Sequence, residues 1–105
     1  MHLSKEQIDI IKNYFSDKPV KSIYLFGSYA TGNATEKSDI DLAFSLIEGT
    51  RISYFGLAKY LVDLENMLHK KVDLVENELL YPRIRNIFDQ DKKLIFKRKI
   101  FYYSM

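Results

Sequence analysis

The chain has no cysteine and no tryptophan, and only two prolines and four glycines among its 105 residues. Without cysteine it can form neither a disulfide nor a cysteine-ligated zinc site, which fits a protein of the cytoplasm. It also lacks a long uncharged apolar stretch and an N-terminal leader of basic, apolar and small residues, so we expect neither a membrane span nor a secretory signal. The net charge of +2 is too small to indicate binding of nucleic acid by itself.

Apolar residues are plentiful enough for one folded core. Hydrophobic residues make up 47% of the chain and aromatic residues 14%, a composition typical of a globular protein. A chain of this length suits a single domain, residues 1–105 with a core at about 20–96. It leaves no room for a second, substrate-binding domain.

Helix and strand patterns alternate along the chain, without a repeat or a linker. Ser4 and Gln7 have the spacing of a capping box and indicate where the first helix begins. The apolar spacing predicts helices at about 5–16, 51–68 and 81–90, and strands at about 20–26, 39–46, 71–76 and 94–96. This order predicts an α/β fold in which the helices cover one face of a small sheet.

A glycine turn follows the first predicted strand. The apolar run 23–26 ends at Gly27, which permits a tight bend and close approach of the backbone to a ligand. Ser28 then begins a short helical turn, where free amide groups attract phosphate oxygens, and Gly32 lets the chain leave that turn. Gly27, Ser28 and Gly32 are therefore the predicted phosphate-binding residues.

Two carboxylates follow at a spacing of two residues. Asp39 and Asp41 lie in a segment of alternating polar and apolar residues, so on a strand both point to one face while Ile40 and Leu42 point to the other. Two like charges held this close repel each other unless a cation lies between them. Carboxylate oxygens suit Mg²⁺, which completes its shell with water and substrate phosphates. The implied substrate is a nucleoside triphosphate.

At this point the residues match a family. Gly27-Ser28, ten intervening residues and Asp39-x-Asp41 resemble the signature of the nucleotidyltransferase superfamily typified by DNA polymerase beta. The small size and the Ser-Asp-Ile-Asp-Leu form are most similar to the minimal nucleotidyltransferase (MNT) group, many members of which are antitoxins paired with a HEPN-domain toxin. The resemblance runs from about Val20 to Val75, and more loosely to Phe96.

The resemblance implies a third carboxylate on a neighbouring strand, and Asp73 in Lys-Val-Asp-Leu-Val is the candidate. It further implies a palm-like mixed sheet on which Asp39, Asp41 and Asp73 bind two Mg²⁺ ions and catalyse transfer of AMP from ATP to a hydroxyl group. The acceptor implied is a tyrosine of a HEPN toxin. The family often has an arginine at the position of Thr31.

Other interpretations stay open at the level of sequence. The chain could be a non-catalytic antitoxin that neutralises its toxin by binding, which the exchanged Thr31 keeps open, or it could modify a small molecule. The Gly-Ser pair and the acids could also be an ordinary loop and a surface strand. Residues 92–97 suit a strand with a solvated basic edge, and Ile100 to Tyr103 suit burial against another protein or a second copy of this chain.

Overall fold

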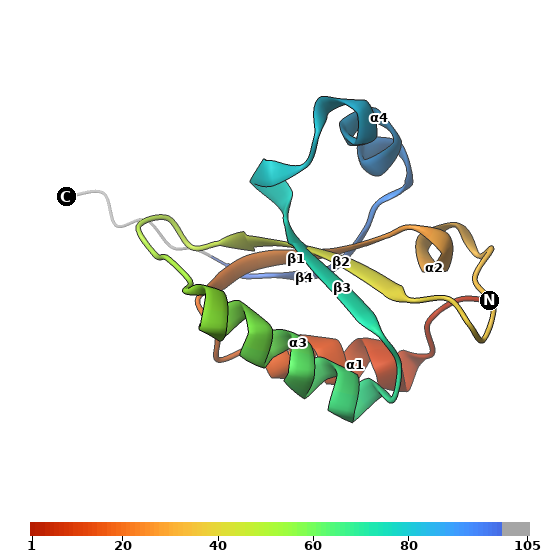
Figure 1. Cartoon of the computed structure of the whole chain (residues 1–105), viewed down its shortest axis with the longest axis horizontal. Helices are drawn as coiled ribbons and strands as arrows, with labels where there is room; N and C mark the ends of the chain where they lie inside the picture. The colour runs from red at the N-terminus through yellow and green to blue at the C-terminus, as the bar shows by residue number, and fades with distance from the viewer. Residues whose placement is uncertain (100–105) are drawn as a thin grey trace.

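The computed structural model, which describes residues 1–99, contains a four-stranded sheet flanked by helices (Figure 1). The strands lie in the order β3-β2-β1-β4, and they are β1 (Val20–Phe26), β2 (Ile40–Leu46), β3 (Val72–Glu76) and β4 (Lys93–Lys97). β1 is antiparallel to β2 and to β4, whereas β2 and β3 are parallel. The sheet is mixed, as the family resemblance implied. The segment Ile100 to Tyr103, which was expected to be buried against another protein or a second copy of this chain, lies outside the described residues.

The helices begin and end close to the predicted positions. They are α1 (Lys5–Phe15), α2 (Ser28–Thr31), α3 (Tyr54–Leu68), the 3₁₀ turn η1 (Asn77–Leu79) and α4 (Pro82–Asp91). The predicted capping box of Ser4 and Gln7 is present, and α3 begins later than predicted because the Ser53 hydroxyl accepts a hydrogen bond from Gly56 N–H. Within residues 1–99, every helix is too short or too polar to cross a lipid bilayer.

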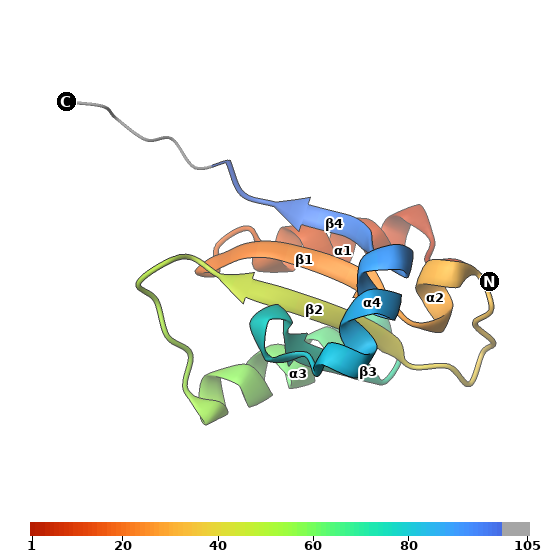
Figure 2. The ribbon, with the colours of Figure 1, turned by 90° about the horizontal axis from the view of Figure 1, so that it is seen from above.

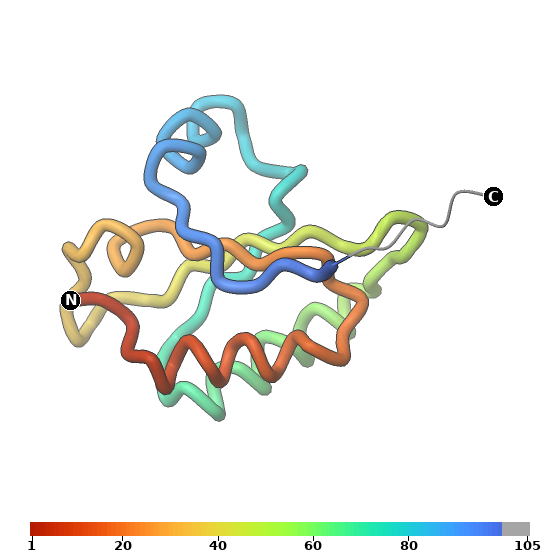
Figure 3. Tube along the Cα trace, turned by 180° about the vertical axis from the view of Figure 1, so that it is seen from behind, coloured from red at the N-terminus to blue at the C-terminus, as the bar shows by residue number. Residues whose placement is uncertain are grey.

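α1 and α3 lie side by side across one face of the sheet (Figures 1 and 3). The helices contribute four buried apolar residues, Ile11, Phe15, Leu64 and Leu68. Opposite them the sheet buries Ile23, Ile40, Leu42 and Val72 in the same cluster, with Leu74 partly buried beside it. Because β2 alternates, burial of Ile40 and Leu42 against the helices turns Asp41 to the other face.

α4 departs from the expectation that the helices cover one face alone. It lies on the face opposite α1 and α3, as the side view and the view from above show (Figures 1 and 2). Its buried Phe88 packs edge-on against Phe26, with ring centroids 5.5 Å apart, and against Tyr24, at 6.2 Å. These aromatic contacts hold α4 over part of the face that carries Asp41.

Arg98 fastens the end of β4 to the turn between α1 and β1. Its Nε donates to the carbonyl of Val20 at 3.1 Å, and its Nη2 to the carbonyls of Phe15, Ser16 and Lys18 at 3.2, 3.1 and 2.9 Å. The carbonyls at the end of α1 have no partners within the helix, so the guanidinium satisfies them. Arg98 follows directly on residues 92–97, the predicted basic edge, and its role is structural.

We expect Arg98→Lys to lower the free energy of unfolding by about 1–3 kcal/mol, because one ammonium group cannot reproduce the planar set of donors. Urea denaturation followed by circular dichroism measures this. The control is Lys97→Ala, an exposed position on β4, where we expect a change of about 0.5 kcal/mol or less. A wild-type denaturation midpoint for Arg98→Lys would contradict the role of Arg98.

Candidate active site

The turn after β1 has the conformation that the sequence predicted. Gly27 has φ 72° and Gly32 has φ 87°, a left-handed region in which glycine avoids the strain of other residues. Between them lies α2, and the amides of Ala30 and Thr31 donate to the Gly27 carbonyl at 3.0 and 3.3 Å. The first amides of a helix have no acceptor within it, so those at Gly27 and Ser28 suit phosphate oxygens.

Asp41 lies directly against this turn. Phe26 and Asp41 are partners in the register of β1 and β2, which brings the aspartate beside Gly27. A Cβ atom placed on Gly27 would lie 2.2 Å from Oδ2 of Asp41, so there is no space for a side chain. Gly27 is thus required both by its φ angle and by the carboxylate, and the glycine turn and Asp41 form one site.

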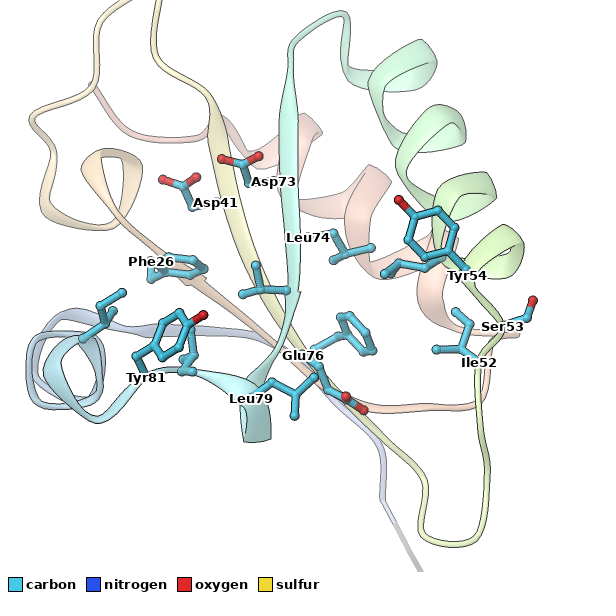
Figure 4. A pocket seen from close by; sticks show the side chains of 15 residues that line it. Phe26, Asp41, Ile52, Ser53, Tyr54, Asp73, Leu74, Glu76, Leu79 and Tyr81 are labelled. Carbon is cyan, nitrogen blue, oxygen red and sulfur yellow. The ribbon is translucent and has the colours of Figure 1, made fainter.

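Asp73 completes a carboxylate pair with Asp41. The two residues are partners in the parallel register of β2 and β3, and both side chains border the same cavity (Figure 4). Asp41 is partly buried and Asp73 is exposed. Burial raises the pKa of Asp41 from its ordinary value of 3.8 to about 6, and the hydrogen bond to Asp73, the charge of Asp73 and that of Asp39 add to the rise.

Asp39 is the more distant member of the predicted triad. It immediately precedes β2 and is exposed, and its charge is the smallest contribution to the pKa of Asp41. Within residues 1–99, no three histidine or acidic side chains converge as a ready-made cage for a metal ion. The pair Asp41–Asp73 nevertheless fits Mg²⁺, which typically takes one or two carboxylates and fills its other positions with water and phosphate. Mg²⁺ binding by the three aspartates stays a prediction.

Ser38, in the Ser-Asp-Ile-Asp motif, shapes the turn that leads to Asp39. Its hydroxyl accepts a hydrogen bond from Thr35 N–H at 2.9 Å, and its own N–H donates to the Thr35 carbonyl at 3.0 Å. From the turn between α3 and β3, the Lys70 ammonium donates to the Glu36 carbonyl at 2.8 Å. These contacts hold the short connection between the glycine turn and the aspartates. Neither Ser38 nor Lys70 was among the predicted site residues.

Thr31, at the position where the family resemblance implied an arginine, lies at the end of α2. Its hydroxyl donates to the Ser28 carbonyl at 3.3 Å, and its side chain borders a small cavity of about 140 Å³ between α2 and α4. The threonine is therefore engaged within its own helix. It supplies no positive charge to a phosphate.

A larger cavity of about 710 Å³ lies beside the carboxylate pair (Figure 4). Most of the side chains around it are apolar, among them Phe26, Phe44, Leu57, Leu74, Leu79, Tyr81 and Ile84. They come from strands, α3 and the segment from η1 to α4. No pattern along the sequence predicted this cavity, because its lining comes from segments that only the folded chain brings together.

Asp41→Asn should stabilise the protein in the absence of divalent cations by about 1–2 kcal/mol at pH 8, since one pKa unit corresponds to about 1.4 kcal/mol and the site is partly open to solvent. The raised pKa means that the wild type loses stability as the pH rises from 3.8 through about 6. Urea denaturation between pH 4 and 8 tests this, with the exposed Asp9→Asn as control. Parallel pH profiles for the wild type and Asp41→Asn would disprove it.

Comparison with known proteins is consistent with this geometry. The family model "Polymerase beta, Nucleotidyltransferase" matches residues 9–100. A protein of Methanocaldococcus jannaschii, provisionally named a protein adenylyltransferase, is 37% identical over 89 residues, which cover 83% of this chain and 89% of the relative. A solved structure provisionally described as a minimal nucleotidyltransferase superposes with a TM-score of 0.70 at 27% identity, covering 85% of this chain and 89% of the other.

Two toxin–antitoxin crystal structures share the fold at lower identity. One, with AMP-PNP, has a TM-score of 0.71 at 23% identity and covers 91% of this chain and 76% of the other. The second is a tri-AMPylated HEPN toxin of Shewanella oneidensis in complex with an MNT antitoxin, with a TM-score of 0.70, 20% identity and coverage of 91% and 74%. From the family match and the archaeal relative, the chain belongs to the polymerase beta nucleotidyltransferase family.

Proposed function

We propose that this protein is a Mg²⁺-dependent protein adenylyltransferase that transfers AMP from ATP to a hydroxyl group of a partner toxin and thereby acts as an antitoxin. The observation that carries the proposal is the carboxylate pair Asp41–Asp73 held against the Gly27 turn. A phosphate-binding turn and a cation-binding pair in direct contact suit a nucleoside triphosphate. The name of the archaeal relative supports protein as the acceptor class.

The roles of the residues follow from their order in space. The amides at Gly27 and Ser28 would bind the β and γ phosphates, so that the α phosphate lies beside Asp41 and Asp73. The acceptor hydroxyl then attacks the α phosphorus: a new oxygen–phosphorus bond forms, the bond to the β phosphate oxygen breaks, and pyrophosphate leaves. A carboxylate oxygen of Asp73, the more exposed of the pair, would take the hydroxyl proton.

Asp39, Asp41 and Asp73 would hold two Mg²⁺ ions. When bound, Mg²⁺ neutralises charge on the phosphates and makes the acceptor hydroxyl easier to deprotonate. Burial and the neighbouring carboxylates make ionisation of Asp41 unfavourable and raise its pKa to about 6. The positive charge of a bound Mg²⁺ would compensate for this.

The acceptor is inferred from the toxin–antitoxin complexes that share the fold. In one of them the HEPN toxin carries AMP groups and is bound to an MNT antitoxin. By extension, we propose a hydroxyl of a HEPN toxin, a tyrosine, as the acceptor for this chain, and ATP as the donor.

Asp41→Asn should lower transfer of label from α-labelled ATP to a HEPN toxin by about 100-fold or more, because it removes one charge of the carboxylate pair. Gel autoradiography measures the transfer, and circular dichroism checks the fold. Asp9→Asn, an exposed position on α1, serves as the matched control and should label the toxin at the wild-type rate. Undiminished labelling by Asp41→Asn would sink the assignment.

A competing function is neutralisation of the toxin by binding alone. It is favoured by Thr31, which donates to the Ser28 carbonyl and supplies no positive charge to a phosphate. A double variant, Asp39→Asn with Asp41→Asn, separates the two. If transfer is the mechanism, cells that produce the toxin together with this variant should stop growing, while pull-down shows that the complex still forms. Full protection by the variant would favour binding without catalysis.

A further inference from the structure

The large cavity beside the carboxylates has a mainly apolar lining, which does not suit phosphate. Phosphate groups are bound by amide N–H groups, cations and hydroxyls, yet beside Asp41 the cavity is lined by the apolar side chains of Phe26, Leu79 and Ile84. The cavity continues around β3 to Leu74 and Tyr54 on the α3 side (Figure 4). A cavity of about 710 Å³ has the size of sites that bind small organic ligands. The proposed function, on which this inference rests, leaves its occupant unassigned.

The order of groups along the site indicates which part of the nucleotide enters. Gly27 borders the small cavity between α2 and α4 and not the large one, whereas Asp41 and Asp73 border the large one. Asp41 lies between the two, with its Oδ2 against Gly27. A triphosphate whose outer phosphates bind at Gly27 and whose α phosphate lies at Asp41 therefore extends its nucleoside away from the turn and into the large cavity.

Two exposed aromatic residues line the cavity, Tyr54 on the α3 side and Tyr81 on the side of Phe26 and Asp41 (Figure 4). Tyr81 lies between η1 and α4, borders the cavity and is 72% exposed. Among the contacts of residues 1–99, its hydroxyl makes no hydrogen bond. Figure 4 shows its ring on the side of the cavity where Phe26 and Leu79 also lie. An exposed ring beside a nucleotide site is suited to stack on a base.

The backbone of Tyr81 is held in place from both sides. Its carbonyl accepts from the amides of Ile84 and Arg85, both at 3.0 Å. The Arg85 guanidinium donates to the Asn77 side-chain oxygen at 2.8 Å and also to the Asn77 carbonyl, and the Asn77 amide donates to the Ser45 hydroxyl at 3.4 Å. This chain of contacts ties η1 and the start of α4 to β2. The ring is thus presented by a fixed segment, which lowers the entropy cost of stacking.

We propose that the large cavity is the nucleoside pocket of this enzyme and that Tyr81 forms its aromatic wall by stacking on the base of the nucleotide. Tyr81 is then a residue that positions the substrate, and its hydroxyl is not required. The ring contributes to binding of the nucleoside and not to binding of the triphosphate. This difference separates its role from a general effect on the fold.

Isothermal titration calorimetry of the whole chain, with Mg²⁺ present, provides the test. The two probes are the β,γ-imido analogue of ATP and inorganic tripolyphosphate. We expect Tyr81→Ala to raise the Kd for the ATP analogue about tenfold, because base stacking is lost, and to leave that for tripolyphosphate unchanged. Tyr81→Phe keeps the ring and should bind both probes as the wild type does.

Phe55→Ala is the matched control. Phe55 is 85% exposed and follows the cavity residue Tyr54, but it does not border the cavity, so its replacement should change neither Kd. Circular dichroism confirms that each variant is folded.

Each contrary result has its own meaning. An unchanged Kd of Tyr81→Ala for the ATP analogue would overturn the proposal, and lost transfer to the toxin in the same variant would place the acceptor in the cavity instead. Equal weakening of both probes would show a structural role and also overturn it. If the wild type bound neither probe, the proposed function itself would fail.

Discussion

The site depends on one constraint, the packing of the Asp41 carboxylate between the backbone of Gly27 and the carboxylate of Asp73. The register of β1 with β2 fixes the first contact, and the parallel register of β2 with β3 fixes the second. Burial raises the pKa of Asp41, and the neighbouring carboxylate of Asp73 raises it further, because two adjacent negative charges destabilise each other. The rest of the fold has to hold this unfavourable pair in place until a cation and a nucleotide compensate for it.

The two faces of the sheet divide that work. α1 and α3 bury Ile40, Leu42 and Val72 on one face, and this burial stabilises the strands that carry the aspartates. On the other face α4 packs through Phe88 and leaves the carboxylates accessible beside it. Arg98 and the contacts between Arg85 and Asn77 fasten segments distant from the sheet centre, so the walls of the site are fixed by hydrogen bonds to the backbone as well as by apolar packing.

The acidic face then has two parts with different chemistry. At the Gly27 turn, backbone amides and carboxylates suit phosphates and cations. Beyond Asp41 and Asp73, the surface becomes apolar, and Tyr81 stands at its rim. A nucleoside triphosphate is divided in the same way, into a charged triphosphate and a less polar nucleoside. A site of this form therefore suits a nucleotide more than an inorganic phosphate. Thr31 lies outside this division, in the small cavity beside α4.

The sequence by itself determined the elements and the local part of the site. Strand alternation, the capping box at Ser4 and the glycine turn depend on neighbours in the chain, so the predicted bounds lie within three residues of those observed. Only the tertiary structure decided that α4 crosses the acidic face, that Arg98 caps α1 and that Tyr81 borders a cavity with Asp73. Each of these depends on contacts between residues far apart in sequence, such as Phe88 with Phe26, and the pattern along one segment does not specify the face on which its partner lies.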